Sequence, residues 1–220
     1  IGWRTLGQAM DYCAQGLIRA GHQSGEMVGI YARNMPEWTQ ADLGILAARG
    51  VSVPIYPTST LDQLRYIVKD AGIRMLFVGE QPQFDQALHL IDSGEISHIV
   101  ALDGTVDLRG CASASHFQTF LVSGNHQPSE LVLRERERHY RMDDLLTLIY
   151  TSGTTGEPKG VMLDFANMAA CFEMHDARLD LSEQDVSLCM LPLSHVFERA
   201  WSYYVLYCGA ENVYIRDPQK

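Results

Sequence analysis

Short apolar runs alternate with amphipathic segments along most of this chain, and that alternation limits the folds it can adopt. The runs Met27–Tyr31, Val51–Ile55 and Met75–Val78 have the length and the apolar composition of buried strands. Between them, apolar residues recur at helical spacing. Strands that alternate with helices favour a mainly parallel sheet with helices on both faces. The sequence therefore predicts an α/β fold of this kind.

Capping and turn residues set the predicted ends of these elements. Thr5 can cap the first helix and Gly21 suits its C-terminal end, while Pro36 suits the first turn of the second helix. The same signals predict helices over residues 61–71 and 84–91 and a strand over 98–102. From residue 145 onward they predict strands over 145–150, 160–163, 187–191 and 212–215, with helices over 165–179 and 197–207.

The middle of the chain breaks this pattern. Residues 104–144 are mixed and polar, and here we expect a helix over 115–121 and a loop around Gly124 and Asn125. The charges alternate in sign over 134–138, which indicates a solvated helix face or a loop. The predicted organisation is a first α/β part over 1–103, a poorly defined connection over 104–144, and a second α/β part over 145–220.

Composition excludes several classes of function. The net charge of −10, without a basic stripe, argues against nucleic-acid binding. The five cysteines are widely spaced and form no CxxC pair, which fits reduced thiols in a cytoplasmic protein better than disulfides or zinc. No apolar run approaches the length that crosses a bilayer, so we expect a soluble protein.

One loop carries most of the functional information. A run of small and hydroxyl residues closed by a lysine follows the apolar segment Leu145–Tyr150, and it reads Thr151-Ser152-Gly153-Thr154-Thr155-Gly156-Glu157-Pro158-Lys159-Gly160. Glycines, inward N–H groups, hydroxyls and an ammonium together can wrap a polyphosphate. A Walker loop would need glycine before the lysine and a hydroxyl residue after it, so this loop is instead predicted to join two strands. The alternative is a hairpin loop with a solvated lysine.

This loop resembles the phosphate-binding signature of the adenylate-forming superfamily, which includes acyl-CoA synthetases, luciferases and the adenylation domains of peptide synthetases. Three further segments, in the same order, are similar to its long-chain fatty acyl-CoA synthetase branch: Tyr31-Ala32-Arg33-Asn34-Met35-Pro36-Glu37-Trp38, Val53-Pro54-Ile55-Tyr56-Pro57-Thr58-Ser59-Thr60 and Leu191-Pro192-Leu193-Ser194-His195-Val196-Phe197-Glu198-Arg199.

The resemblance implies an AMP-forming long-chain fatty acid:CoA ligase. Such an enzyme joins a carboxylate to the α-phosphorus of ATP, releases pyrophosphate, and then transfers the acyl group to the thiol of CoA. The chemistry needs charge neutralisation by donors, lysine and Mg²⁺ rather than a protein nucleophile. Fatty acid, ATP and CoA are the implied partners, with peripheral contact at the inner face of a membrane to collect the lipid.

Site residues follow from the same resemblance. It implies that Thr151, Ser152, Gly153, Thr154, Thr155, Gly156 and Lys159 hold the β- and γ-phosphates, with Thr151 near Mg²⁺. It places His195 beside the acyl carboxylate and the α-phosphate. The alternatives are a surface role for Lys159 and a helix-capping or core role for His195.

Other positions either depart from the family pattern or suggest structural roles. Arg199 stands where some long-chain synthetases carry an aromatic gate, and Trp201 is out of register with it. The segments around Asn34 and over 53–57 are interpreted as a helix start and a strand end. The aromatic residues on the following helix could line an acyl pocket or belong to an ordinary core. They are Phe197, Trp201, Tyr203, Tyr204 and Tyr207.

Members of the superfamily are usually much longer than these 220 residues, so the resemblance implies part of the large N-terminal domain. The adenine, ribose and second lysine sites would lie beyond Lys220, and the fragment alone is expected to be inactive. Two alternatives stay open, namely a ligase for an aryl or medium-chain acid and a non-catalytic nucleotide-binding α/β module.

Overall fold

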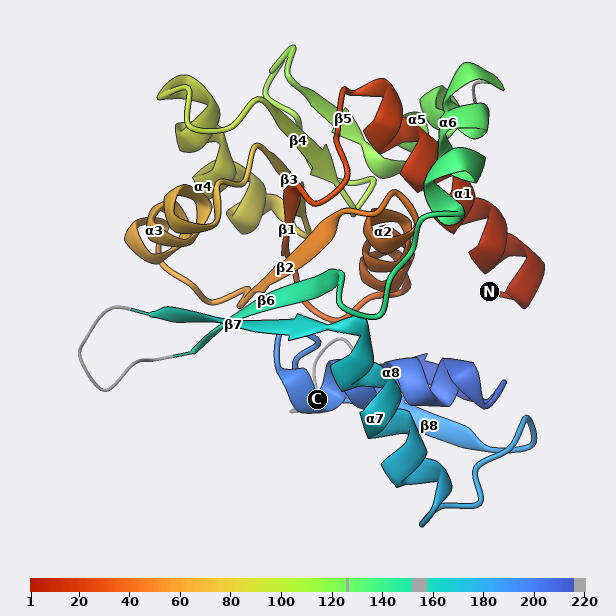
Figure 1. Cartoon of the computed structure of the whole chain (residues 1–220). Helices are drawn as coiled ribbons and strands as arrows, with labels where there is room; N and C mark the ends of the chain where they lie inside the picture. Colours follow the sequence, from red (N-terminus) through yellow and green to blue (C-terminus); the bar gives the residue numbers. More distant parts are fainter. Residues whose placement is uncertain (126, 152–157, 216–220) are drawn as a thin grey trace.

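The computed structural model describes residues 1–125, 127–151 and 158–215. Its strands are β1 (Met27–Tyr31), β2 (Val51–Ile55), β3 (Met75–Val78), β4 (His98–Ala101), β5 (Ala114–His116), β6 (Leu145–Thr151), β7 (Lys159–Asp164), β8 (Val186–Cys189) and β9 (Glu211–Tyr214). Seven of them form one sheet in the order β5-β4-β3-β1-β2-β6-β7, and the pair β8-β9 lies apart from it (Figure 1). Within the larger sheet only β6 and β7 pair antiparallel among the described strands.

Helices cover both faces of the larger sheet, as predicted. They are α1 (Trp3–Arg19), α2 (Pro36–Ala47), α3 (Leu61–Ala71), α4 (Gln81–Asp92), α5 (Phe117–Gly124), α6 (Gln127–Glu137), α7 (Phe165–Asp176) and α8 (Val196–Tyr207). One buried cluster joins α1, α2 and α5 to Val28 and Ile30 of β1. A second cluster joins α3 and α4 to Val53 of β2 and Leu76 of β3. The mainly parallel α/β fold is therefore confirmed.

Local sequence signals explain most of the helix ends. The Thr60 hydroxyl accepts from the backbone N–H of Gln63, whose side chain accepts from the N–H of Thr60, and this capping box starts α3. Gly21 has a φ of +91° just after α1, a conformation that favours glycine. The predicted Thr5 cap is wrong, because Leu6 N–H already bonds to the carbonyl of Gly2 and places Thr5 inside the first turn.

The connection over residues 104–144 is more ordered than the sequence indicated. The strand β5 was not predicted, α5 begins and ends later than the expected 115–121 helix, and Gly124 is its last residue rather than part of a loop. The charged run lies at the end of α6, a helix that the polar composition hid. Helix α6 is attached to the rest of the protein by Leu133, which is fully buried, and by Arg136, which donates to the carbonyls of His22 and Ala48.

Replacing Gly124 by alanine is expected to destabilise the protein by about 1–3 kcal/mol, since overpacking forces the backbone to shift. A Cβ at this position would lie 1.9 Å from the carbonyl oxygen of Tyr12 on α1. The matched control is Gly7→Ala within α1, where a Cβ meets nothing within 4 Å. That change is expected to stabilise the helix by about 0.5–1 kcal/mol. Urea unfolding of both variants tests the contact, and equal effects of the two changes would contradict it.

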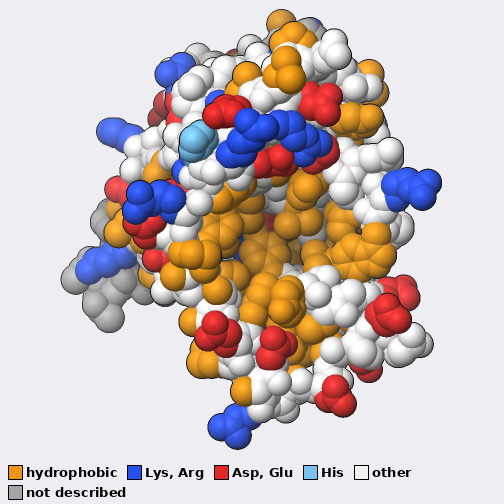
Figure 2. Space-filling view, turned by 45° about the vertical axis from the view of Figure 1, so that its right-hand side comes forward, with side chains coloured by type: hydrophobic (Ala, Val, Ile, Leu, Met, Phe, Trp, Pro, Cys, Tyr) orange, Lys and Arg blue, Asp and Glu red, His pale blue; other side chains and the backbone are white. Residues whose placement is uncertain are grey.

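A small apolar seam connects the sheet to the unit formed by α7, α8, β8 and β9. Leu46 of α2, Leu146 of β6 and Tyr203 of α8 cluster there, with Phe165 and Phe172 of α7 packed against them. Figure 2 shows hydrophobic side chains gathered in a hollow across one face of the molecule, with charged side chains above and below it. None of the described helices combines the length and the apolar character needed to span a membrane.

Candidate active site

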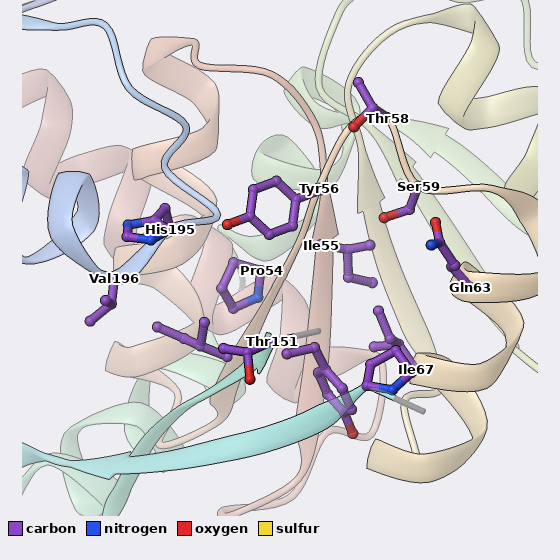
Figure 3. A pocket seen from close by; sticks show the side chains of 13 residues that line it. Pro54, Ile55, Tyr56, Thr58, Ser59, Gln63, Ile67, Thr151, His195 and Val196 are labelled. Carbon is purple, nitrogen blue, oxygen red and sulfur yellow. The ribbon is translucent and has the colours of Figure 1, made fainter. Parts of the chain in front are cut away.

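A pocket of about 490 Å³ opens where the chain connections diverge in the sheet. From β2 the chain continues through α3 to β3, whereas from β6 it continues to β7 in the opposite direction. In open α/β sheets such a divergence leaves a crevice at the carboxyl ends of the strands, and ligands bind there. The described lining residues are Pro54, Ile55, Tyr56, Thr58, Ser59, Gln63, Ile67, Ile149, Tyr150, Thr151, Pro158, His195 and Val196 (Figure 3).

The glycine- and hydroxyl-rich loop joins two strands, as predicted. Thr151 ends β6 and lines the pocket, and Lys159 begins β7 directly opposite it in the antiparallel ladder. Lys159 is exposed and is not among the lining residues. Ser152, Gly153, Thr154, Thr155 and Gly156 lie outside the described residues. Because a strand rather than a helix follows the lysine, the loop differs from a Walker loop.

Helix α3 holds both stems of this loop. The Tyr150 hydroxyl donates to the carboxylate of Asp70 at 2.6 Å, and the Tyr66 hydroxyl donates to the carbonyl of Pro158 at 3.1 Å. Burial, together with the neighbouring Asp70 carboxylate, raises the pKa of the Tyr150 phenol, so this hydroxyl stays a donor at neutral pH. Tyr66 and Asp70 are one helical turn apart and therefore face the stems together.

His195 caps α8 and also faces the pocket. Its Nδ1 accepts a hydrogen bond from the backbone N–H of Phe197 at 3.2 Å, which makes it the N-cap of the helix. In the neutral imidazole one nitrogen accepts and the other carries the proton, so the proton lies on Nε2. Figure 3 shows His195 and Tyr56 on one side of the pocket, with Thr151 on its floor. The capping interpretation and the site interpretation thus describe the same residue.

Arg199 is not part of the pocket. Its side chain is 2% exposed and forms two hydrogen bonds to the Asp42 carboxylate, at 2.7 and 3.0 Å, across from α2. It also donates to Thr147 of β6 and lies over the ring of Trp38. Burial alone would lower the pKa of this guanidinium, but the interactions with the Asp42 carboxylate and with Tyr203 together outweigh burial, and the pKa is raised. Arg199 therefore remains charged and serves the core.

The aromatic residues of α8 do not line the described pocket either. Tyr203 and Tyr204 are buried, while Phe197 and Tyr207 are 62% exposed. Trp201 donates from its indole nitrogen to the hydroxyl of Ser187 on β8. Of this helix only Val196 is among the described lining residues. In the described part of the chain Tyr203 and Tyr204 fit the core interpretation, whereas the exposed Phe197 and Tyr207 fit neither a core role nor the lining of the described pocket.

Sequence reasoning missed one wall of the site. The segment over 53–57 was interpreted as structural, yet Pro54, Ile55 and Tyr56 line the pocket together with Thr58 and Ser59. A signal was present, since the hydroxyl-bearing residues Tyr56, Thr58 and Ser59 come directly after β2, a strand that is buried along its whole length. Ends of parallel strands are where such side chains meet a ligand.

The pocket is chemically suited to an anion. None of its described lining residues is acidic, although the chain carries 27 Asp and Glu residues and a net charge of −10. The described lining offers hydroxyls, an amide and an imidazole N–H, all of which can donate hydrogen bonds to oxyanions. Among the described residues no group of three or more His, Cys, Asp or Glu side chains could hold a metal ion.

Known proteins are similar to this chain in sequence and in fold. The family model for the AMP-binding enzyme matches residues 1–220. Long chain acyl-CoA synthetase 6, peroxisomal, of Arabidopsis thaliana is 31% identical over 216 residues, covering 94% of this chain and 30% of that protein. The long-chain-fatty-acid–CoA ligase FadD15 of Mycobacterium bovis is 34% identical over 193 residues, covering 86% of this chain and 31% of that protein.

Solved structures extend the likeness to the backbone. A long-chain-fatty-acid-CoA ligase (FadD1) from Archaeoglobus fulgidus superposes with a TM-score of 0.77 and 21% identity, over 97% of this chain and 40% of that one. The chain spans about 30% of the length of the two sequence relatives. Since the family model covers all 220 residues, this chain belongs to the AMP-binding, adenylate-forming enzymes, and its likeness to their long-chain acyl-CoA synthetase branch is confirmed.

Proposed function

We propose that this chain is part of an AMP-forming long-chain fatty acid:CoA ligase. The observation that carries the proposal is the pocket itself, in which Thr151, at the start of the glycine-rich loop, and His195 line one cavity without an acidic neighbour among its described lining. The relatives at 31% and 34% identity are named as long-chain acyl-CoA ligases, which supports the substrate class.

The proposed first step brings two anions together, a fatty acid carboxylate and the triphosphate of ATP. Thr151, the loop Ser152–Gly156 and Lys159 would hold the β- and γ-phosphates, with backbone and hydroxyl donors near the strand end and an ammonium opposite. The Nε2–H of His195 would donate to an oxygen of the carboxylate or the α-phosphate and so orient them. Donors fixed in advance stabilise developing charge without reorganisation, which is where such sites gain most of their rate.

Mg²⁺ fits this site as a companion of the nucleotide. It prefers oxygen ligands and is commonly held by phosphates, waters and one or two protein groups. The described lining has hydroxyl oxygens, with Thr151 nearest to the loop, but no carboxylate. Thr151 would therefore be the contact from this chain, and the metal would neutralise phosphate charge.

The experiment is an ATP–pyrophosphate exchange assay on the complete polypeptide that contains this chain, with Mg²⁺ and a panel of fatty, medium-chain and aryl acids. We expect exchange with long-chain acids, followed by release of AMP when CoA is added. Preference for an aryl or medium-chain acid would favour the alternative ligase. Absence of exchange with every acid in the panel would favour the non-catalytic module. The 220 residues alone are expected to show no exchange.

The proposal also includes the place of the protein in the cell, in the cytoplasm and at the surface of a membrane. Long-chain fatty acids partition into bilayers, so a cytoplasmic ligase for them would gain from peripheral contact with the membrane surface.

A further inference from the structure

The backbone just before His195 is held in place by side chains rather than by strand pairing. The Leu191 N–H donates to the carboxylate of Glu198 at 3.1 Å. The carbonyl of Leu191 accepts from the Asn34 amide at 2.6 Å, and the Leu193 N–H donates to the Asn34 amide oxygen at 2.9 Å. Residues 190–195 lie between the end of β8 and the start of α8, outside both elements.

Asn34 reaches this segment from a distant part of the chain. It lies between β1 and α2, and 157 positions separate it from Leu191. Its amide acts as both donor and acceptor on Leu191 and Leu193, much as a neighbouring strand would, and it also contacts the carbonyl of Cys189 at 3.3 Å. The amide thereby ties the seven-stranded sheet to the segment that leads into the cap of α8.

The position of His195 follows from these contacts. Its own N–H bonds to the carbonyl of Pro192 at 2.9 Å, so the turn that carries the imidazole is built on the residues that Asn34 holds. On the other side of His195, Arg199 fixes the first turns of α8 to Asp42. A segment held at both ends keeps the pocket-lining imidazole in one orientation, and preorganised geometry of this kind is what catalytic donors need.

We propose that Asn34 is a positioning residue that sets the orientation of His195 toward the pocket. The role is more specific than the helix start that its sequence context indicated. The inference rests on the proposed function only for its effect on catalysis. Its structural part, the coupling between Asn34 and His195, can be measured without any substrate.

The structural test uses the complete polypeptide that contains this chain and the substitution Asn34→Ala. We expect amide hydrogen exchange at Leu193 to become about tenfold faster, the size of one lost hydrogen bond, and the ¹⁵N signals of the His195 ring to lose the pattern of a single Nε2–H tautomer. The control is Asn212→Ala on β9, whose amide contacts Ser202 of α8 but not residues 191–193. It should change neither readout. Equal exchange in both variants, or an unchanged imidazole in Asn34→Ala, overturns the proposal.

The catalytic test uses the complete polypeptide. Asn34→Ala should lower kcat for acyl-adenylate formation by about tenfold and leave KM for ATP within about twofold, since the proposed contacts to the β- and γ-phosphates come from Thr151, its loop and Lys159 rather than from His195. Asn34→Asp keeps an oxygen for the Leu193 N–H but loses the donor to Leu191, so it should lower kcat by less than alanine does, and it supplies the measurement if alanine prevents folding. A rise in KM for ATP with unchanged kcat overturns the role. If the wild-type polypeptide shows no exchange, the proposed function fails, and the structural test still decides on Asn34.

Discussion

Replacing Arg199 by methionine is expected to lower the free energy of unfolding by about 3–5 kcal/mol, because it leaves a buried carboxylate without its partner. Asp42 is fully buried, and both of its oxygens accept from the guanidinium. Methionine fills much of the same volume, so the loss measures the uncompensated charge more than a cavity. Urea unfolding followed by circular dichroism at neutral pH gives the value directly.

A second substitution separates charge from packing. In the double variant Arg199→Met with Asp42→Asn the buried charge is gone, while the amide can still accept from the Tyr203 hydroxyl that bonds Asp42 in the wild type. It should recover about 1–3 kcal/mol relative to Arg199→Met alone. The exposed pair of Arg138 and Glu135 provides the control, and Arg138→Met should not move the unfolding midpoint. A double variant no more stable than Arg199→Met would show that packing dominates.

The strands and helices of the first hundred residues could be predicted closely, because their signals are local. The bounds of β1, β2 and β3 coincide with the apolar runs, and α3 starts at its capping box and ends before Gly72, whose φ is +69°. Each of these features lies within a few positions of the boundary that it sets. Tertiary contacts only reinforce them.

Residues 104–144 show why the rest could not be predicted. Helix α6 has few buried residues, namely Ser129 and Leu133 among those described, so it lacks the apolar stripe that marks a helix in a sequence. Its order depends on distant partners, such as the carbonyls that Arg136 reaches and the Asp11 carboxylate that bonds Arg134 at 2.9 Å. These contacts span 88 to 123 positions and leave no periodic pattern in the sequence.

The candidate site divides in the same way. Thr151 ends β6 of the seven-stranded sheet, whereas His195 lies six positions after β8, which belongs to the two-stranded sheet, so strand ends alone would not bring the two residues together. Their place in one pocket could be predicted only from the family resemblance, which implied that both contact the nucleotide. The residues that hold them could not, because the bonds of Asn34 to Leu191 and of Arg199 to Asp42 each span 157 positions. The family resemblance marked Arg199 as a departure from an aromatic gate without giving it a role, and the structure places it in the core.

In the complete polypeptide, His195→Asn is expected to reduce the rate of acyl-adenylate formation by about 10²–10³, the usual cost of one preorganised donor to a developing oxyanion. The reason for asparagine is the double role of the histidine. Asparagine is a preferred N-cap and can still accept from the Phe197 N–H, so α8 keeps its start, while the N–H that the imidazole offers in the pocket lining is replaced by a shorter side-chain amide.

His195→Ala supplies the contrast, because it removes both roles. It should lose the same activity and, in addition, about 1 kcal/mol of stability from the missing cap. ATP–pyrophosphate exchange and urea unfolding, measured on the same two variants, keep the two contributions apart. If His195→Asn retains wild-type exchange while His195→Ala loses only stability, the imidazole is a helix cap and another group must orient the carboxylate. The Tyr56 hydroxyl in the described lining is a candidate for that role (Figure 3).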